Sequence, residues 1–249
     1  ATGGLGGFQA RLTLPRRITA RLDEWPTWDL RVAIDVNQDL GDLSAPETVR
    51  SAAEPEFQAN VKVVEVTDGV WHLTGQSHHS VLVEFDEFLA LIEAPMPEAR
   101  TLAVIEQARQ LQPDKPLQYL INTHHHFDHS GGVRAAVSEG LTIVTHEINR
   151  EFFEDLVAGP RTIHPDALVR NPEALNLELV TADEVYELTD GRRTMHVVRI
   201  FQDEHCADML MVHLPRERLL IEADVFSPGS PIAPFAPNLL KNVNDLEWE

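Results

Sequence analysis

Alternating hydrophobic and polar positions predict a β-hairpin near the N-terminus. Residues 18–23 alternate between apolar and polar side chains, and the alternation resumes over residues 30–36. A period of two is typical of a half-buried strand, so we expect two paired strands with a turn at Trp25-Pro26. Residues 39–59 are instead rich in Gly, Ser, Pro, Ala and Glu, which predicts a linker with at most one helical turn.

A second series of strands begins after residue 60. Four short apolar runs are separated by turn residues such as Asp68-Gly69, and this punctuation predicts an antiparallel meander. The runs cover residues 62–66, 70–74, 80–85 and 88–92. From Pro97 to Gln112, apolar side chains recur at helical spacing. This pattern predicts a helix that packs on the sheet.

Strands and helices alternate in the middle of the chain. The pattern predicts a strand at residues 117–122, a helix at 132–138 and a strand at 141–145. This order implies a parallel crossover, and ligands commonly bind at the carboxyl ends of such strands. A further helix is expected at residues 149–157, and residues 159–177, which contain three prolines, read as a long loop with at most one short helix.

The last part of the chain returns to strands. We expect these strands at residues 185–188, 194–201, 209–214 and 219–222. Residues 241–249 show no clear structural pattern. The whole pattern predicts a mixed fold of the α/β (α+β) class, with an N-terminal β-hairpin and linker segment at residues 1–60 and a main domain at residues 61–249.

One ten-residue stretch, THHHFDHSGG, follows the strand predicted at residues 117–122. In an extended segment alternate side chains point to the same side, so His124 and His126 face one point. A loop that curls after them brings Asp128 and His129 to that point as well. Imidazole and carboxylate groups together suit zinc or another first-row divalent metal. A solvated histidine cluster or a purification tag is the alternative, but a tag would lie at a terminus and would lack the aspartate.

Composition narrows the classes of partner. Forty acidic against twenty basic residues give a formal charge of -20, which disfavours nucleic acid because a surface that follows phosphates needs a basic stripe. No run of eighteen apolar residues is present, so we expect no membrane-spanning segment. Cys206 is the only cysteine, which rules out an internal disulfide. The sequence starts at Ala1 without an initiator Met or a signal peptide, so we expect a soluble protein that has been processed or trimmed. The sequence does not indicate a cellular compartment.

Two later residues give the histidine-rich stretch its context. His205 and Asp224 each follow a predicted strand, and each taken alone also fits an ordinary surface position. Because His205 and Asp224 follow the histidine-rich stretch in this order along the chain, the segment from about residue 61 to residue 226 resembles the metallo-β-lactamase superfamily of hydrolases. Its signature is His-x-His-x-Asp-His after a strand, then a later His and a later Asp. The early strand ends in Glu93, where the family usually has Asp.

The resemblance implies a four-layer αββα sandwich with zinc ions at one rim of two packed sheets. It assigns one zinc ion to His124, His126 and His205, and a second to Asp128, His129 and a bridging Asp224. In the implied reaction a metal-bound hydroxide attacks a carbonyl, and Asp128 orients the water and takes its proton.

One part of the family pattern is absent from this sequence. The family supplies a last histidine to the second metal from a later strand end, but no histidine follows His213. The resemblance also predicts further strand and helix beyond Glu249. We therefore expect either one or two bound zinc ions. A chain shortened at its C-terminus is one explanation for the missing histidine.

The substrate expected for such a hydrolase is a small ester, lactone, thioester or β-lactam. An iron-dependent oxidoreductase or dioxygenase of the same fold is the alternative, since iron accepts the same ligands. A catalytically silent metal-binding module is a third. His78 and His79, in a turn before a predicted strand, are candidates for substrate binding, and Cys206 reads as a small packed thiol. Besides a small-molecule substrate, a second copy of the chain, in a homo-oligomer, is a candidate partner.

Overall fold

The computed structural model describes residues 17–22, 25–31, 44–52, 57–230 and 233–246. The chain divides into two compact units, Ala1–Pro55 and Glu56–Glu249. None of the helices in the described ranges is long and apolar enough to cross a membrane.

The N-terminal unit contains a two-stranded antiparallel sheet and one helical turn. Strand β1 (Arg17–Leu22) pairs with β2 (Trp25–Arg31), and α1 (Glu47–Arg50) follows. The hairpin and the single helical turn were expected, but the predicted turn at Trp25-Pro26 is wrong because β2 begins at Trp25. A proline is tolerated there since a two-stranded ribbon leaves backbone groups unpaired at both edges. The predicted end of the second strand, residues 32–36, lies outside the described residues.

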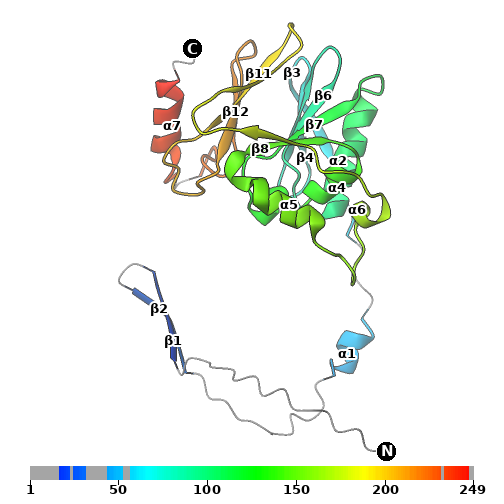
Figure 1. The fold of residues 1–249 in the computed structure, drawn as a ribbon, viewed down its shortest axis with the longest axis vertical. Helices are drawn as coiled ribbons and strands as arrows, with labels where there is room; N and C mark the ends of the chain where they lie inside the picture. The colour runs from blue at the N-terminus through cyan, green and yellow to red at the C-terminus, as the bar shows by residue number, and fades with distance from the viewer. Residues whose placement is uncertain (1–16, 23–24, 32–43, 53–56, 231–232, 247–249) are drawn as a thin grey trace, which may run out of the picture. The chain divides into compact units, whose positions relative to one another are not determined.

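The main unit is built on a seven-stranded sheet in the order β3-β4-β5-β6-β7-β8-β9 (Figure 1). Its strands are β3 (Lys62–Thr67), β4 (Val70–Thr74), β5 (Ser80–Glu84), β6 (Leu89–Ile92), β7 (Leu117–Ile121), β8 (Thr142–His146) and β9 (Leu177–Val180). Strands β3 to β6 form the expected antiparallel meander. Strands β6 to β9 are parallel, and the crossover pattern predicted this pairing for β7 and β8. Strand β9 lies where the sequence suggested the end of a loop, and it was not predicted.

Helices cover one face of this sheet. They are α2 (Glu98–Leu111), α4 (Val133–Ser138), α5 (Arg150–Ala158) and α6 (Ala167–Arg170). The short helix α3 (Phe127–Ser130) follows the end of β7, and the 3-10 turn η1 (Glu147–Asn149) follows the end of β8. Strand β6 shows how the sheet separates two cores. Leu89 and Leu91 pack on the helical side with Val104 and Val137, whereas Ile92 packs on the opposite side. This alternation follows from the period of two along a strand.

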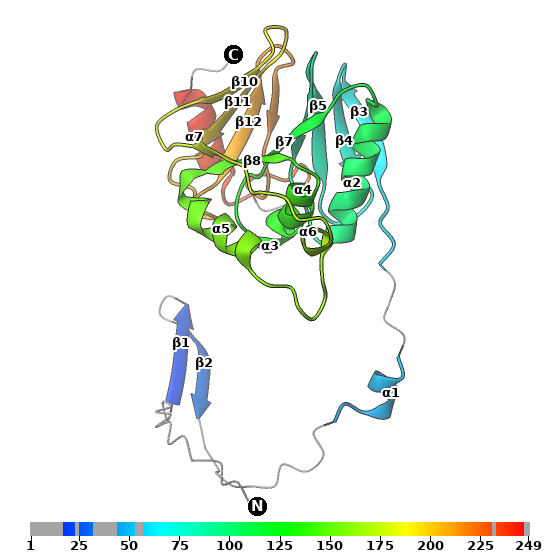
Figure 2. The ribbon, with the colours of Figure 1, turned by 45° about the vertical axis from the view of Figure 1, so that its right-hand side comes forward.

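A four-stranded antiparallel sheet packs on the second face. It contains β10 (Tyr186–Thr189), β11 (Thr194–Arg199), β12 (Leu210–Leu214) and β13 (Leu219–Ile221). Its outer face is covered by α7 (Ala236–Asp245), which was not predicted, and Leu239 of this helix packs with Met211 and Val198. Figure 2 shows the two sheets side by side with helices outside each. The four-layer αββα architecture is confirmed.

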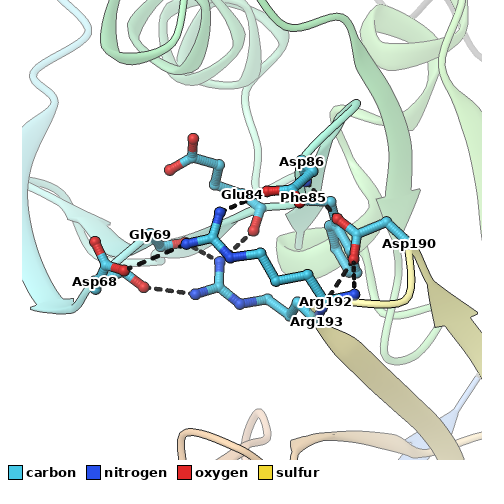
Figure 3. A pocket seen from close by; sticks show the side chains of 8 residues that line it. All are labelled: Asp68, Gly69, Glu84, Phe85, Asp86, Asp190, Arg192 and Arg193. Atoms are coloured by element: carbon cyan, nitrogen blue, oxygen red, sulfur yellow. Dashed lines mark hydrogen bonds and ion pairs between the residues drawn. The ribbon is translucent and has the colours of Figure 1, made fainter.

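The two sheets are joined at one end by a buried arginine in the β10–β11 turn (Figure 3). Arg193 Nη2 donates to the carbonyl of Asp68 at 2.6 Å, and Nη1 donates to that of Gly69 at 3.2 Å. Its Nε donates to the carboxylate of Glu217 at 2.9 Å. Asp68 and Gly69 form the β3–β4 turn of the seven-stranded sheet, and Glu217 lies in the β12–β13 turn of the other sheet. The Arg193 side chain therefore connects the two sheets. We call this contact the Arg193 clamp.

Candidate metal centre

The histidine-rich loop leaves the end of β7 and is held close to α2. Its chain stays extended through His126 and then turns into the short helix α3. Gly132 N donates to the carbonyl of Ala94 at 2.9 Å. A Cβ atom at Gly132 would lie 1.9 Å from Thr101 Oγ1. Only glycine fits at this position, which explains part of the Gly-Gly pair that ends the motif.

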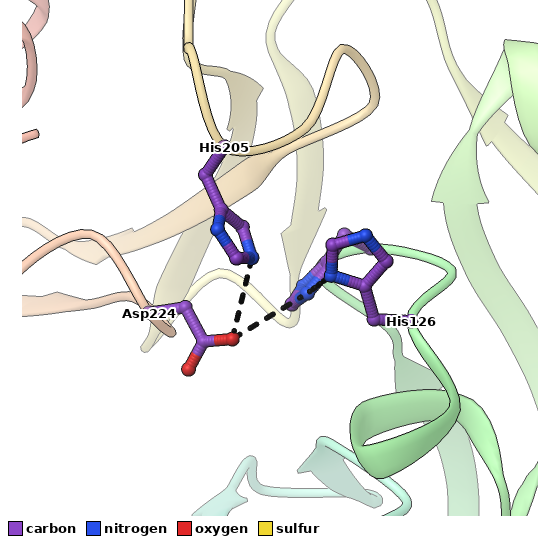
Figure 4. Close-up of side chains that lie close together, drawn as sticks. His126, His205 and Asp224 are labelled. Atoms are coloured by element: carbon purple, nitrogen blue, oxygen red, sulfur yellow. Dashed lines mark hydrogen bonds and ion pairs between the residues drawn. The ribbon is translucent and has the colours of Figure 1, made fainter. Parts of the chain in front are cut away.

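Three imidazoles and one carboxylate converge where β7 and β13 end. His124 Nε2 lies 3.1 Å from His126 Nδ1 and 3.7 Å from Asp224 Oδ2. His205 Nε2, from the loop before β12, lies 3.4 Å from the same Asp224 oxygen. The ligand atoms of all four side chains are within 4.8 Å of one another, and Figure 4 shows three of them around a common point. We call these four residues the first ligand group.

A second ligand group, formed by His78, Asp128 and His129, lies beside the first. His78 Nε2 is 3.1 Å and His129 Nε2 is 3.8 Å from Asp128 Oδ2. All three ligand atoms lie within 4.8 Å of one another. His129 Nε2 is also 3.0 Å from Asp224 Oδ2. One oxygen of Asp224 therefore contacts both groups.

The spacing within both groups suits a small tetrahedral cation. Zinc binds nitrogen and oxygen ligands at about 2.0–2.2 Å, which places two tetrahedral ligands about 3.3 Å apart. The separations of His129 and His205 from Asp224, 3.0 and 3.4 Å, agree with this value. Nε2 of each of these histidines is buried and makes no well-aligned hydrogen bond to any residue that the structure describes. Because buried polar atoms without a partner are costly, these nitrogens fit a bound metal.

The protonation states of the site also favour a cation. Burial and the neighbouring His129 and His126 lower the pKa of His124 to about 3, so its ring is neutral and keeps a free electron pair. Burial acts to lower the pKa of His129, but Asp224 and Glu93 raise it to about 10. The same contact with His129 lowers the pKa of Asp224 to about 2. His129 thus lies between two carboxylates, 2.6 Å from Glu93 and 3.0 Å from Asp224, whose negative charge a metal ion bound here would offset.

The backbone and hydrogen bonds fix the ligand side chains. Asp224 has a φ of 65°, a left-handed conformation that is uncommon outside glycine and is found more often for Asp and Asn. Glu93, at a φ of 72°, accepts a 2.6 Å hydrogen bond from His129 Nδ1 and a 2.8 Å hydrogen bond from the Thr123 amide. The hydroxyl of Thr123 lies 3.0 Å from His124 Nδ1. These contacts leave Nε2 of both histidines turned toward the site.

The buried carboxylate of Asp208 accepts hydrogen bonds that hold the histidine-rich loop in place. Asp208 accepts a 2.9 Å hydrogen bond from the His125 amide and a 2.7 Å hydrogen bond from Asn149 Nδ2. Burial and Asp208 raise the pKa of the Cys206 thiol to about 12, so the thiol stays protonated and donates to that carboxylate. Asp208 thus connects the β7–α3 loop with the β11–β12 loop. Cys206 Sγ is 3.9 Å from His126 Nε2.

The structure assembles most, but not all, of the side chains that the sequence singled out. The six expected ligands lie in the two groups or between them, and His78 joins the second. His79 remains outside both: it is exposed, its Nε2 contacts the Gln76 carbonyl at 2.9 Å, and it lines a cavity of about 210 Å³ beside the groups. Sequence reasoning missed Asp208 altogether. Its only local signal is a polar residue directly before a buried apolar strand.

Comparison with known proteins places this arrangement in context. A family model described as the metallo-beta-lactamase superfamily matches residues 73–233. The solved metallo-beta-lactamase of Pontibacter korlensis is 17% identical, with a TM-score of 0.52 over 76% of this chain and 85% of that protein. The mono-zinc form of FIM-1 from Pseudomonas aeruginosa is 17% identical, with a TM-score of 0.58 over 79% of this chain and 87% of that one.

A curated enzyme gives a shorter match. The linear primary-alkylsulfatase of a Pseudomonas species is 28% identical over 99 residues, which is 39% of this chain. The matched segment covers 15% of the length of that enzyme.

Proposed function

Because the chain belongs to the metallo-beta-lactamase superfamily, we propose that it is a zinc-dependent hydrolase of small carbonyl substrates. The observation that carries this proposal is the position of Asp224. Its Oδ2 atom lies within 3.7 Å of His124, 3.4 Å of His205 and 3.0 Å of His129. One carboxylate oxygen at the junction of two imidazole groups is suited to bridging two metal ions.

The proposed ligands divide as the two groups do. His124, His126 and His205 would hold one zinc ion, Asp128 and His129 would contribute to a second, and Asp224 would contact both. Bound zinc supplies a nucleophilic water at neutral pH and polarises a carbonyl oxygen. The zinc form of FIM-1 supports zinc over iron as the first metal to test.

Asp128 is the proposed general base. The Asp128 side chain is about one-quarter exposed, and its carboxylate lies 3.1 Å from His78 Nε2, so it reaches both the second ligand group and solvent. A carboxylate in this position can orient the attacking water and accept its proton. Asp208, which is buried behind the loop and already accepts hydrogen bonds from His125 and Asn149, cannot take that role.

The substrate panel follows from the chemistry and from the curated match. An ester, a lactone, a thioester and a β-lactam each present a carbonyl carbon. The match to an alkylsulfatase adds a primary alkyl sulfate. The chain would be loaded with zinc and separately with iron, and turnover of each substrate would be measured beside oxygen uptake.

Turnover with zinc, lost on chelation and restored by zinc, is the expected result. We expect Asp128→Asn to lower kcat/KM by about 10²–10⁴-fold, the usual contribution of a general base. Asp183→Asn, which removes the same charge from an exposed turn, serves as the matched control and should retain activity. Oxygen uptake with iron alone would instead identify an oxidoreductase, and zinc binding without turnover on any substrate would identify a silent module.

A further inference from the structure

A histidine from the β4–β5 loop, His78, lies in the second ligand group. We propose that His78 is itself a metal ligand and donates Nε2 to the ion held by Asp128 and His129. This assignment rests on the proposed function, because it presupposes a second metal ion. It changes the role of His78 from a substrate contact, as the sequence suggested, to part of the metal centre.

The position of the ring carries the first step of the argument. His78 Nε2 lies 3.1 Å from Asp128 Oδ2, which is within the spacing of about 3.3 Å expected between two ligands of a tetrahedral zinc ion. The ring centroids of His78 and His129 are 5.3 Å apart, and the ring planes are at 89°. The ligand atoms of His78, Asp128 and His129 therefore surround one small volume rather than a flat surface.

The tautomer of His78 favours ligation. Its Nδ1 atom lies 3.0 Å from the hydroxyl of Ser77. A metal-binding imidazole usually donates its other ring N–H to such an acceptor, which leaves the second nitrogen free to bind. The side chain is 34% exposed, so a cation can reach Nε2 from the cavity beside it.

Hydrogen bonds fix the start of the β4–β5 loop, and this loop carries His78. Gly75 has a φ of 111°, and a Cβ atom there would lie 2.4 Å from the Asn60 carbonyl oxygen. Asn60 Nδ2 donates to the Gly75 carbonyl at 3.3 Å. Buried Arg100 donates to the Asn60 carbonyl at 2.6 Å and to the Thr74 carbonyl at 3.0 Å. A ligand on such an anchored loop loses little freedom on binding.

The next residue provides an internal comparison. His79 belongs to the same loop, but its Nε2 contacts the Gln76 carbonyl at 2.9 Å and its ring contacts His72 with centroids 4.8 Å apart. It belongs to no ligand group among the described residues. Substituting His79 therefore perturbs the same loop without removing a proposed ligand.

The test measures metal binding rather than activity. Wild type, His78→Ala, His78→Gln and His79→Ala would be stripped with chelator, titrated with zinc and analysed for bound zinc per chain. Cobalt(II) absorption spectra would report the ligand number at each position. We expect wild type and His79→Ala to bind two ions. His78→Ala should bind the second ion at least about 100-fold more weakly, since removing a ligand should cost at least as much as losing an outer partner of one.

His78→Gln separates ligation from positioning. The glutamine amide can still donate a hydrogen bond to Asp128 but cannot replace the imidazole nitrogen, so we expect it to behave as His78→Ala does. Two ions bound with wild-type affinity by His78→Ala, rescue by His78→Gln, or a single ion in wild type would each overturn the assignment. If wild type binds no zinc at all, the proposed function itself fails. Thermal unfolding of the metal-free variants would identify any that do not fold.

Discussion

Asp224 is the residue on which both ligand groups depend. Its left-handed backbone follows β13, and Glu222 holds the turn by accepting a hydrogen bond from the Val225 amide at 2.9 Å. Asparagine adopts the same backbone conformation readily, so Asp224→Asn should fold. Because Asp224 Oδ2 faces His124, His205 and His129, we expect this change to weaken binding of both ions.

Zinc titration monitored by mass spectrometry checks that expectation. Asp128→Asn is the comparison, since Asp128 belongs only to the second ligand group. It should weaken one binding step and leave the other near its wild-type value. Equal loss in both variants, or loss of a single step in Asp224→Asn, would contradict a shared carboxylate.

Glu93 offers a second prediction for a single side chain. The residue is 6% exposed, and its carboxylate accepts a hydrogen bond from His129 Nδ1 at 2.6 Å. Glu93→Gln keeps the shape but removes the charge that orients the imidazole. We expect zinc affinity at the second ligand group to fall about 10–100-fold, which is the usual effect of losing an outer carboxylate. Glu87→Gln, at an exposed turn, is the matched control, and isothermal titration calorimetry is the measurement.

Single residues were predictable from sequence where the chemistry is local. The spacing of His124 and His126 follows from the alternation of an extended chain, and it needs no tertiary information. Partners such as Asp208 were not predictable, because Asp208 and His125 are 83 residues apart. Only the packed sheets bring such pairs together.

At the scale of elements, a part-buried ion pair fixes the loop between α5 and β9 to the helix α4. Arg134 of α4 binds the Asp166 carboxylate and also donates to the Leu156 and Val157 carbonyls at 2.8 and 2.6 Å. Asp166 in turn accepts from the Val169 amide at 3.0 Å as the N-cap of α6. The Arg134–Asp166 pair therefore connects α4, the end of α5 and α6.

The pH dependence of Asp166→Asn tests this connection. The hydrogen bond from Arg134 lowers the pKa of Asp166, so its stabilising effect is present above the unfolded pKa of about 3.9 and is lost as the pH falls below it. Asparagine keeps the cap but loses the ion pair. We expect the free energy of unfolding at pH 7 to fall by about 1–3 kcal/mol. The gap from wild type should narrow toward pH 3 in urea denaturation, and a constant gap would contradict the ion pair.

Elements were predictable where a periodic pattern was long enough. The meander and the α2 and β7 segments were expected, because each buries one face at a regular period. Strand β9 was not predicted, because its four residues follow a proline-containing segment and are too few to show a clear alternation of apolar and polar side chains. Helix α7 was missed because part of what fixes it is remote: Asn242 Oδ1 accepts from the Phe201 amide at 2.7 Å.

At the scale of the molecule, the Arg193 clamp lies at the end opposite the ligand groups. Strands β6 and β7 run from the turn end toward the histidines, whereas Asp68, Gly69 and Arg193 all precede their strands. Its guanidinium binds three backbone carbonyls, those of Glu84, Asp68 and Gly69, and one carboxylate. A lysine keeps the charge but cannot make these contacts at once.

We therefore expect Arg193→Lys to lower the free energy of unfolding by about 2–4 kcal/mol while leaving zinc stoichiometry unchanged. Arg192→Lys is the matched control, because Arg192 is about half exposed and pairs with Asp86 at the surface. Because exposed ion pairs contribute little, this control should unfold at a guanidinium concentration close to that of wild type. Guanidinium denaturation followed by metal analysis measures both effects. A similar loss of unfolding free energy in the two variants would show that the Arg193 clamp does not stabilise the fold more than a surface ion pair does.

The separation of the two ends bears on how this chain can diversify. The loops that carry the ligand groups, residues 75–79, 122–132, 202–208 and 222–226, leave the strand ends farthest from Arg193. A lineage can therefore lengthen, shorten or recombine those loops while the distant turns keep the sheets closed. Natural variation in the sequence should therefore accumulate in the loops at the histidine end. The arginine end should change slowly, because a substitution there would weaken the packing of both sheets.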